Sequence, residues 1–290
     1  MAEWRAHARE AEALGYSALY IHDHLHPQYG PLVAATVAAE ATTSLHVGTL
    51  VLNNDLRNSV VLAREIATLG LAAEGRIEIG LGAGYEETDY AAAGITLDNP
   101  TTRVDRLEES VLVMTALWRE GAVTFEGRHL KVQDALCEPR PAVPPRVIIG
   151  GASRRIFAVA ARHADIVGVN RLAASKVGGD LVKMYAVDHY DRCRDLIRQE
   201  TGERFDSLEL QIAAASVMVL KSGRSAGRAA AMLGFTSDDA LDSPAVLIGT
   251  VDHLCERLWQ SRERWGFSNV VVPGEAMRDF APVVAQMAGK

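Results

Sequence analysis

The sequence lacks the features of a membrane protein, a disulfide-stabilised protein or a zinc protein. Its 290 residues include three cysteines, which lie far apart and form no C-x-x-C pair. No apolar run approaches the ~18 residues that cross a bilayer, and the N-terminal segment carries charges where a signal peptide has an apolar core. We therefore expect a globular protein of the cytoplasm that binds no membrane.

An excess of positive charge is also absent. The chain has 30 Lys and Arg against 37 Asp and Glu, which gives a formal net charge of −7. An acidic chain is poorly suited to phosphate backbones and anionic lipid surfaces, so nucleic acid is not expected as a partner. The apolar fraction of 48% is that of an ordinary globular protein, and the expected partner is a small molecule.

Short β-branched runs alternate along the chain with segments of helical period. The expected strands are residues 17–21, 45–52, 76–80, 146–150, 165–169, 210–219 and 268–272. The expected helices are residues 4–14, 31–43, 59–73 and 100–120, the last with Asn99 as its N-cap. Strands separated by helices of this length predict right-handed βαβ crossovers and a parallel sheet.

Two α/β architectures accommodate this pattern. Seven expected strands fit either a doubly wound sheet or a (β/α)8 barrel whose first strand would precede Met1. We expect one domain over residues 1–290, with insertions at about 122–145 and 234–243. The first insertion contains a predicted hairpin at 122–132 that turns at Glu126 and Gly127.

Three histidines at the end of the first expected strand are candidates for chemistry. His22, His24 and His26 are spaced by two, so they would share one face of a strand. A metal site is compatible with this spacing, although no carboxylate partner is identifiable and Pro27 interrupts the strand. We prefer a histidine that handles a proton or faces a cofactor, because imidazole exchanges protons near neutral pH. An ordinary loop is the remaining alternative.

Glycines mark two further strand ends. Gly80, Gly82 and Gly84 lack the spacing of the dinucleotide fingerprint, so they indicate either a tight turn or a flat ring close to the backbone. Residues 150–153, Gly-Gly-Ala-Ser, join a strand to a helix, where unpaired amide groups and the helix dipole favour a phosphate. A turn without a ligand is the alternative.

Several of these segments resemble one enzyme family. Residues 47–84, which begin VGTLVLNND and end GRIEIGLGAG, resemble the third-to-fourth strand region of the bacterial luciferase-like monooxygenase family. Residues 20–25 and 150–165 resemble its second strand, which ends in Asp-His, and its fifth strand with the following helix. Residues 247–288 are similar to the C-terminal part of the deazaflavin-dependent branch. The resemblance implies a (β/α)8 barrel, without its first strand in this chain, that binds coenzyme F420 or, alternatively, FMN.

The resemblance also implies which residues form the site. His24 matches a histidine beside the cofactor ring, and Tyr85 stands where related sugar-phosphate dehydrogenases have a glutamate proton donor, so we expect both to be catalytic. The expected cofactor-binding residues are Leu50 and Val51, joined by a predicted cis peptide bond behind the ring, together with Gly82, Gly84, Gly151, Ala152, Ser153 and Asn170.

Departures from the family pattern limit what the resemblance implies about the substrate. Gln28 replaces a tryptophan of those dehydrogenases, Asn170 replaces a threonine, and Ala173 falls where they have a lysine, so a sugar phosphate is not expected. We expect hydride transfer from reduced F420 to another small organic substrate. The alternatives are an FMN-dependent monooxygenase served by a reductase and a non-catalytic flavin-binding homologue. The family's pairing mode implies a homodimer through residues 33–41 and 60–71.

Overall fold

The chain divides into two compact units. The computed structural model describes residues 1–171, 180–222, 226–235 and 241–289. Unit 1 comprises residues 1–13 and 17–149, and unit 2 comprises residues 14–16 and 150–290. Ala173 and part of the second expected insertion, residues 236–240, lie outside the described residues.

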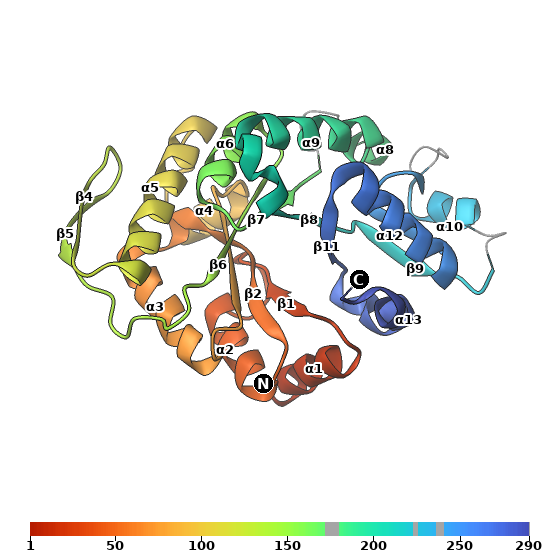
Figure 1. The fold of residues 1–290 in the computed structure, drawn as a ribbon, viewed down its shortest axis with the longest axis horizontal. Coiled ribbons are helices and arrows are strands. Elements are labelled where there is room, and N and C mark those ends of the chain that lie inside the picture. The colour runs from red at the N-terminus through yellow and green to blue at the C-terminus, as the bar shows by residue number, and fades with distance from the viewer. Residues whose placement is uncertain (172–179, 223–225, 236–240, 290) are drawn as a thin grey trace. The chain divides into compact units, whose positions relative to one another are not determined.

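Unit 1 is built on a parallel sheet. Its strands pair in the order β1-β2-β3-β6, each parallel to its neighbour. The helices α2, α3 and α5 lie along one side of these strands (Figure 1). The strands are β1 (Ala18–Ile21), β2 (His46–Asn53), β3 (Ile77–Gly82), β4 (Val123–Glu126), β5 (Lys131–Ala135) and β6 (Arg146–Gly151). The helices are α1 (Ala2–Ala13), α2 (Pro31–Ala41), η1 (Asn54–Leu56), α3 (Ser59–Ala72), α4 (Glu87–Ala93) and α5 (Pro100–Arg119).

Side-chain caps fix where two helices of unit 1, α3 and α5, begin. The Asn58 side chain accepts hydrogen bonds from the first amide groups of α3, and Asn99 caps α5 as predicted, with Oδ1 3.0 Å from the Thr102 nitrogen. The two helices pack together, and the Trp118 indole donates a 2.9 Å hydrogen bond to the Ala63 carbonyl. The predicted hairpin is confirmed as the antiparallel pair β4 and β5.

Unit 2 contains two sets of paired parallel strands. One has the order β7-β8-β11, and the other is the pair β9 and β10. The strands are β7 (Ile166–Val169), β8 (Glu209–Ala213), β9 (Ser216–Val219), β10 (Val246–Gly249) and β11 (Phe267–Val271). The helices are α6 (Arg154–His163), α8 (Leu181–Met184), α9 (Val187–Thr201), η2 (Gly202–Ser207), α10 (Ala226–Met232), α12 (Val251–Trp265), η4 (Gly274–Ala276) and α13 (Met277–Met287).

One expected strand is wrong, because the chain changes partners inside it. Residues 210–219 were expected as one strand, but β8 ends at Ala213 and β9 begins at Ser216. At the break, the Ala214 amide donates to the Val271 carbonyl, whereas the Ala215 amide donates to the Ala245 carbonyl. β8 thus pairs with β11 and β9 with β10, a strand that the sequence pattern missed.

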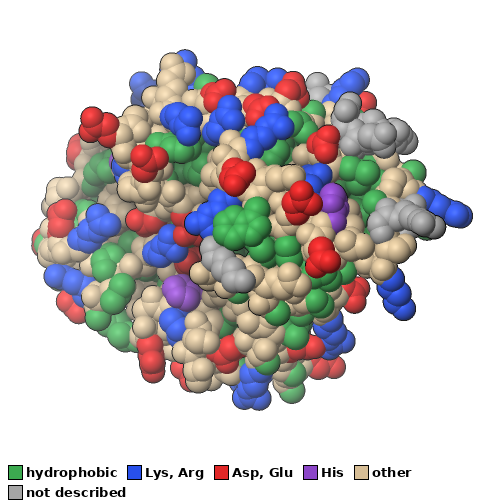
Figure 2. Space-filling view, turned by 45° about the vertical axis from the view of Figure 1, so that its right-hand side comes forward, with side chains coloured by type: hydrophobic (Ala, Val, Ile, Leu, Met, Phe, Trp, Pro, Cys, Tyr) green, Lys and Arg blue, Asp and Glu red, His purple; other side chains and the backbone are tan. Residues whose placement is uncertain are grey.

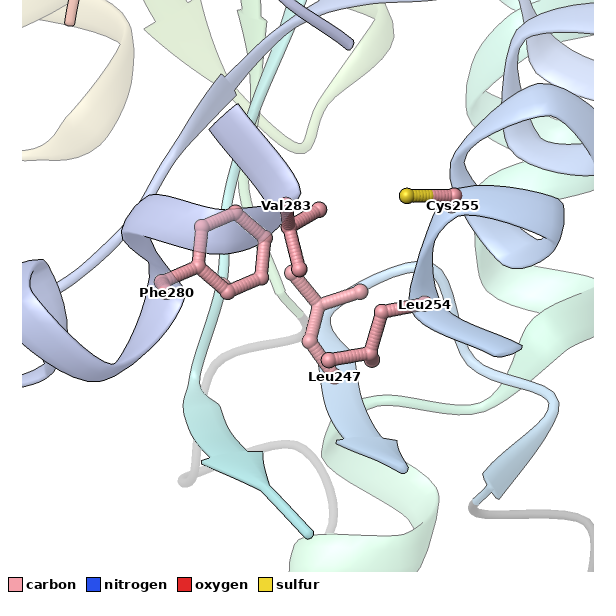
Figure 3. Packing of buried hydrophobic residues seen from close by; sticks show 6 residues of the cluster. Leu247, Leu254, Cys255, Phe280 and Val283 are labelled. Carbon is pink, nitrogen blue, oxygen red and sulfur yellow. The ribbon is translucent and has the colours of Figure 1, made fainter. Parts of the chain in front are cut away.

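The apolar core of unit 2 shows how its C-terminal helices are held. Leu254 and Cys255 on α12 face Phe280 and Val283 on α13, with Leu247 of β10 between them (Figure 3). Leu254 and Val283 are fully buried. Burial of apolar side chains of this size stabilises a fold by about 1.5–3 kcal/mol each.

The surface carries charges of both signs. On the face shown in Figure 2, acidic and basic side chains are interspersed with apolar ones, and neither sign forms a broad area. Among the helices that the structure describes, none is both long enough and apolar enough to span a bilayer.

Candidate active site

The three histidines after β1 make three different contacts. His22 Nδ1 lies 2.8 Å from the Leu50 carbonyl oxygen, and His24 Nδ1 lies 2.6 Å from Asp89 Oδ2. His26 stacks on His24, with ring centroids 5.2 Å apart. Within the described part of the chain, no group of three or more His, Cys, Asp or Glu side chains is arranged to hold a metal ion.

Asp89 is the buried partner of His24. It lies in α4 and is 4% exposed, and its second oxygen accepts a 2.8 Å hydrogen bond from the Leu25 amide. Burial by itself would raise the pKa of the Asp89 carboxyl, but the hydrogen bonds from Leu25 and His24 outweigh it and hold the pKa below its ordinary value. Asp89 is therefore an ionised acceptor at neutral pH.

Tyr85, the second expected catalytic residue, lies against the same imidazole. Its ring stands edge-on to His24, with centroids 5.9 Å apart. The side chain is 66% exposed, in contrast to the partly buried His24. The structure thus brings the two expected catalytic residues together.

The end of β2 carries the predicted irregular backbone. The peptide bond between Leu50 and Val51 is cis, as predicted, and the register of β2 against β3 shifts between Thr49 and Leu52. Through the His22 contact with the Leu50 carbonyl, this bulge lies beside the histidine segment.

The glycines of β3 and its following turn make room for neighbouring side chains. A Cβ on Gly82 would lie 2.6 Å from Val51 Cγ2, so this glycine lets the β2 bulge approach β3. Gly84 has a φ of +72°, and a Cβ there would lie 2.2 Å from the Tyr90 hydroxyl. Both glycines are therefore required by packing within unit 1.

Two further carboxylates support these strand ends, and the sequence analysis missed the role of both. Asp23 is buried, accepts a 2.9 Å hydrogen bond from the Asn53 amide and pairs with Arg57 through both of its oxygens. Asp55 accepts hydrogen bonds from the Tyr90 hydroxyl at 2.8 Å and from Arg106 at 2.6 Å. Burial and the nearby Asp55 raise the pKa of Tyr90 to about 12, so its hydroxyl stays a donor.

An open pocket of about 650 Å³ adjoins the histidine segment. Most of its surface is aromatic or apolar, and the lining residues are Trp4, Tyr20, Ile21, His22, Pro27, Gln28 and Tyr29. Gln28 Nε2 donates to the carbonyl oxygens of His22 and His24 at 3.0 and 2.9 Å, so it holds the loop between them. This pocket is large enough for a small organic molecule.

In unit 2, the turn before α6 gathers the other expected cofactor-binding residues. Ser153 is the N-cap of α6, and its hydroxyl accepts from the Ile156 amide at 3.4 Å. The backbone N–H of Asn170 donates a 2.8 Å hydrogen bond to the Gly151 carbonyl oxygen, which joins the turn to the end of β7. A Cβ on Gly151 would lie 2.5 Å from Ile156 Cγ2, so the backbone of the turn packs directly against its own helix. The remaining first-turn amide groups make a helix N-terminus that suits an anion.

The N-terminal two thirds of the chain match one family model. Residues 1–186 match the model described as luciferase-like monooxygenase. The chain belongs to the luciferase-like monooxygenase family.

Curated relatives of this luciferase-like chain include F420-dependent enzymes. The F420-dependent glucose-6-phosphate dehydrogenase of Intrasporangium calvum is 34% identical over 169 residues, which cover 55% of this chain and 51% of that protein. The F420-dependent hydroxymycolic acid dehydrogenase of Mycobacterium tuberculosis is 28% identical over 168 residues, 55% of this chain and 46% of that protein. The chain spans about half the length of the curated relatives it matches.

Solved structures show the fold of this luciferase-like chain. An F420-dependent secondary alcohol dehydrogenase in complex with an F420-acetone adduct matches with a TM-score of 0.74 at 18% identity, over 98% of this chain and 94% of that one. This likeness confirms the expected fold class, an α/β fold of the luciferase-like barrel type.

Proposed function

We propose that this luciferase-like chain is an F420-dependent oxidoreductase that reduces a small organic substrate. The observation that supports it best is the pairing of His24 with the buried carboxylate of Asp89; His24 lies two residues after His22, which contacts the β2 bulge. The F420-dependent names of its curated relatives support the choice of cofactor.

The residues of unit 1 fit the ring of such a cofactor. Leu50 and Val51 at the bulge carry partly exposed apolar side chains, and the glycines beside it keep β2 and β3 in close contact. His24 stands at the adjacent strand end with its ring oriented by Asp89. F420, when bound in its reduced form, supplies a hydride, and the protein supplies orientation and a proton.

His24 is proposed to give that proton. With Nδ1 directed at Asp89, the ring exchanges its proton through Nε2. The ionised Asp89 accepts the Nδ1 hydrogen bond and so orients the ring, which leaves Nε2 to face the substrate. Tyr85 is proposed to cover the imidazole and limit the access of water, since its ring lies edge-on to it.

The turn at residues 150–153, considered within unit 2 alone, is proposed to bind a phosphate group. The support comes from its backbone, because the ten-residue helix α6 begins there and Ser153 adds a hydroxyl. Arg154 does not contribute its full charge, because it pairs with Glu200 at 2.7 Å.

We also propose that two copies of the chain associate through α2 and α3. The alanines Ala34, Ala35, Ala38 and Ala39 are buried within unit 1, so they pack on their own sheet. Val33, Val61 and Leu71 are 62%, 45% and 54% exposed and are the apolar side chains available to a second copy. A monomeric mass in light scattering at micromolar concentration would contradict this pairing.

The proposed function is tested first by binding. Purified chain is titrated with F420 and, in parallel, with FMN, and cofactor fluorescence is followed. We expect micromolar or tighter binding of F420 and weaker binding of FMN, and turnover under anaerobic conditions. A preference for FMN, or binding of neither cofactor, would overturn the proposal.

His24→Asn separates binding from chemistry. We expect this variant to keep its affinity for F420 and to lose about 10²-fold or more in the rate of cofactor oxidation by substrate, because the proton donor is absent. Glu126→Gln is the matched control, since Glu126 pairs with Lys131 on the exposed β4–β5 hairpin. Equal rates in His24→Asn and the unmodified chain would exclude His24 as the proton donor.

A further inference from the structure

Asp89 has two hydrogen-bond partners of different kinds. Its Oδ1 accepts from the backbone amide of Leu25 at 2.8 Å, and its Oδ2 lies 2.6 Å from His24 Nδ1. The Leu25 amide is always a donor, whereas the His24 nitrogen is a donor or an acceptor according to the tautomer of the ring. An ionised carboxylate only accepts, so both partners must donate to it.

The accounting of donors and acceptors fixes the tautomer of His24. Because Asp89 offers no proton, the His24 proton resides on Nδ1, and Nε2 is left as the nitrogen that exchanges protons. The Asp89 side chain is 5% exposed, so water competes weakly for these bonds. The short α4, with Gly94 ending it at a φ of +69°, holds Asp89 in this position.

We propose that Asp89 is a positioning residue that keeps a proton on Nδ1 of His24 and thereby directs proton exchange to Nε2. The inference rests on the proposed role of His24 as proton donor. Asp89 also holds the backbone of Leu25, so one carboxylate fixes both the direction of the imidazole and the chain that follows it.

Asp89→Asn is the sharpest variant, because it keeps the size of the side chain and changes its hydrogen-bonding pattern. The asparagine has one accepting oxygen and one donating nitrogen. Since the Leu25 amide can only donate, the oxygen must face Leu25 and the NH2 group must face His24 Nδ1. The ring can then accept at Nδ1 only by moving its proton to Nε2, and protonation of both nitrogens would place two donors face to face.

The tautomer is read by nitrogen NMR of chain labelled with 15N-histidine. The chain has nine histidines, and the His24 signals are assigned as those missing from His24→Asn. In the unmodified chain we expect Nδ1 of the neutral ring to give the signal of a protonated nitrogen and Nε2 that of an unprotonated one. In Asp89→Asn we expect the reverse assignment, with the proton on Nε2 and Nδ1 unprotonated. In Asp89→Glu, which retains a carboxylate, we expect the proton to stay on Nδ1.

Each outcome decides the proposal. A neutral His24 ring that carries its proton on Nε2 in the unmodified chain overturns it without any variant, so the test does not depend on how well Asp89→Asn folds. An unchanged tautomer in folded Asp89→Asn overturns it as well, and Glu126→Gln controls for loss of a carboxylate elsewhere in unit 1. The proposed function fails separately, in the F420 titration, while the tautomer of His24 is measured without cofactor.

Discussion

The strand ends of unit 1 and the turn of unit 2 are built in different ways. In unit 1, buried carboxylates hold the backbone, as Asp23 does for Asn53 and Asp89 does for Leu25. In unit 2, the turn before α6 is shaped by close packing, with Gly151 against Ile156. A site that transfers protons needs charged groups that are fixed in place and shielded from water. A site that binds an anion needs unpaired backbone N–H groups that side chains do not cover.

These two kinds of packing predict that stability responds differently to substitution in each unit. When a buried carboxylate is removed, its hydrogen-bond donors and any positively charged partner remain buried without an acceptor. This lowers the free energy of unfolding. A close-packed glycine turn is destabilised when a side chain is added to the glycine. Shortening the side chain that the glycine contacts should reverse that loss.

Asp23→Asn is expected to have the largest effect. The variant removes the buried charge opposite Arg57 and leaves one of the donors around it without an acceptor. We expect the free energy of unfolding to fall by on the order of 3 kcal/mol, as for other broken buried pairs. Urea denaturation at neutral pH measures the loss, with Glu126→Gln as the control on the exposed hairpin.

An equal, small effect of Asp23→Asn and Glu126→Gln would contradict the distinction between buried and exposed carboxylates. Exposed pairs such as Glu126 with Lys131, whose side chains are 75% and 73% exposed, contribute about 0–1 kcal/mol.

Gly151→Ala is expected to have an intermediate effect in unit 2. The added Cβ would lie 2.5 Å from Ile156 Cγ2, and a β-branched side chain in a helix has little freedom to move away. We expect a loss of about 1–3 kcal/mol. The double variant with Ile156→Ala should recover part of it, which a double-mutant cycle in urea measures. Additive losses would show that the glycine acts through its backbone and not through this contact.

Most of the strands could be predicted because their signal is local. The β-branched runs correspond to β1, β2, β3, β6, β7 and β11 within a residue or two at each end. The division into β8 and β9 could not, because nothing at Ala214 and Ala215 marks a break. The Ala214 amide donates to Val271, 57 residues further along the chain, and the Ala215 amide donates to Ala245, 30 residues further along.

The residues of the candidate site also fall into those that could be predicted from the sequence and those that could not. The spacing of the histidines pointed to the segment of residues 22–26. The family resemblance then selected His24 and predicted the cis peptide bond between Leu50 and Val51. Asp89 carried no recognisable signal, because an acidic residue in the first turn of a helix is common for electrostatic reasons alone. Its role appears only when a contact across 65 residues brings it to His24.

The smallest expected effect belongs to a carboxylate at the other end of β2. Glu12 Oε1 accepts from the amide groups of Ser44, Thr43 and Leu45, which immediately precede β2, while Asp23 holds Asn53 at its far end. The hydrogen bond from Ser44, with those from Thr43 and Leu45, lowers the pKa of Glu12 to about 2 despite some burial.

Because the folded pKa of Glu12 lies below its ordinary value of 4.5, its ionised form stabilises the fold above about pH 4.5, and that contribution is lost as the pH falls towards 2. Glu12→Gln keeps an accepting oxygen and loses the charge, so we expect a loss of about 1 kcal/mol at pH 7. The difference between variant and unmodified chain should shrink as the pH is lowered from 5 to 3, which urea denaturation at a series of pH values measures. A difference independent of pH would mean that Glu12 acts through shape rather than charge, and the start of β2 would then be held in the way that the turn of unit 2 is held.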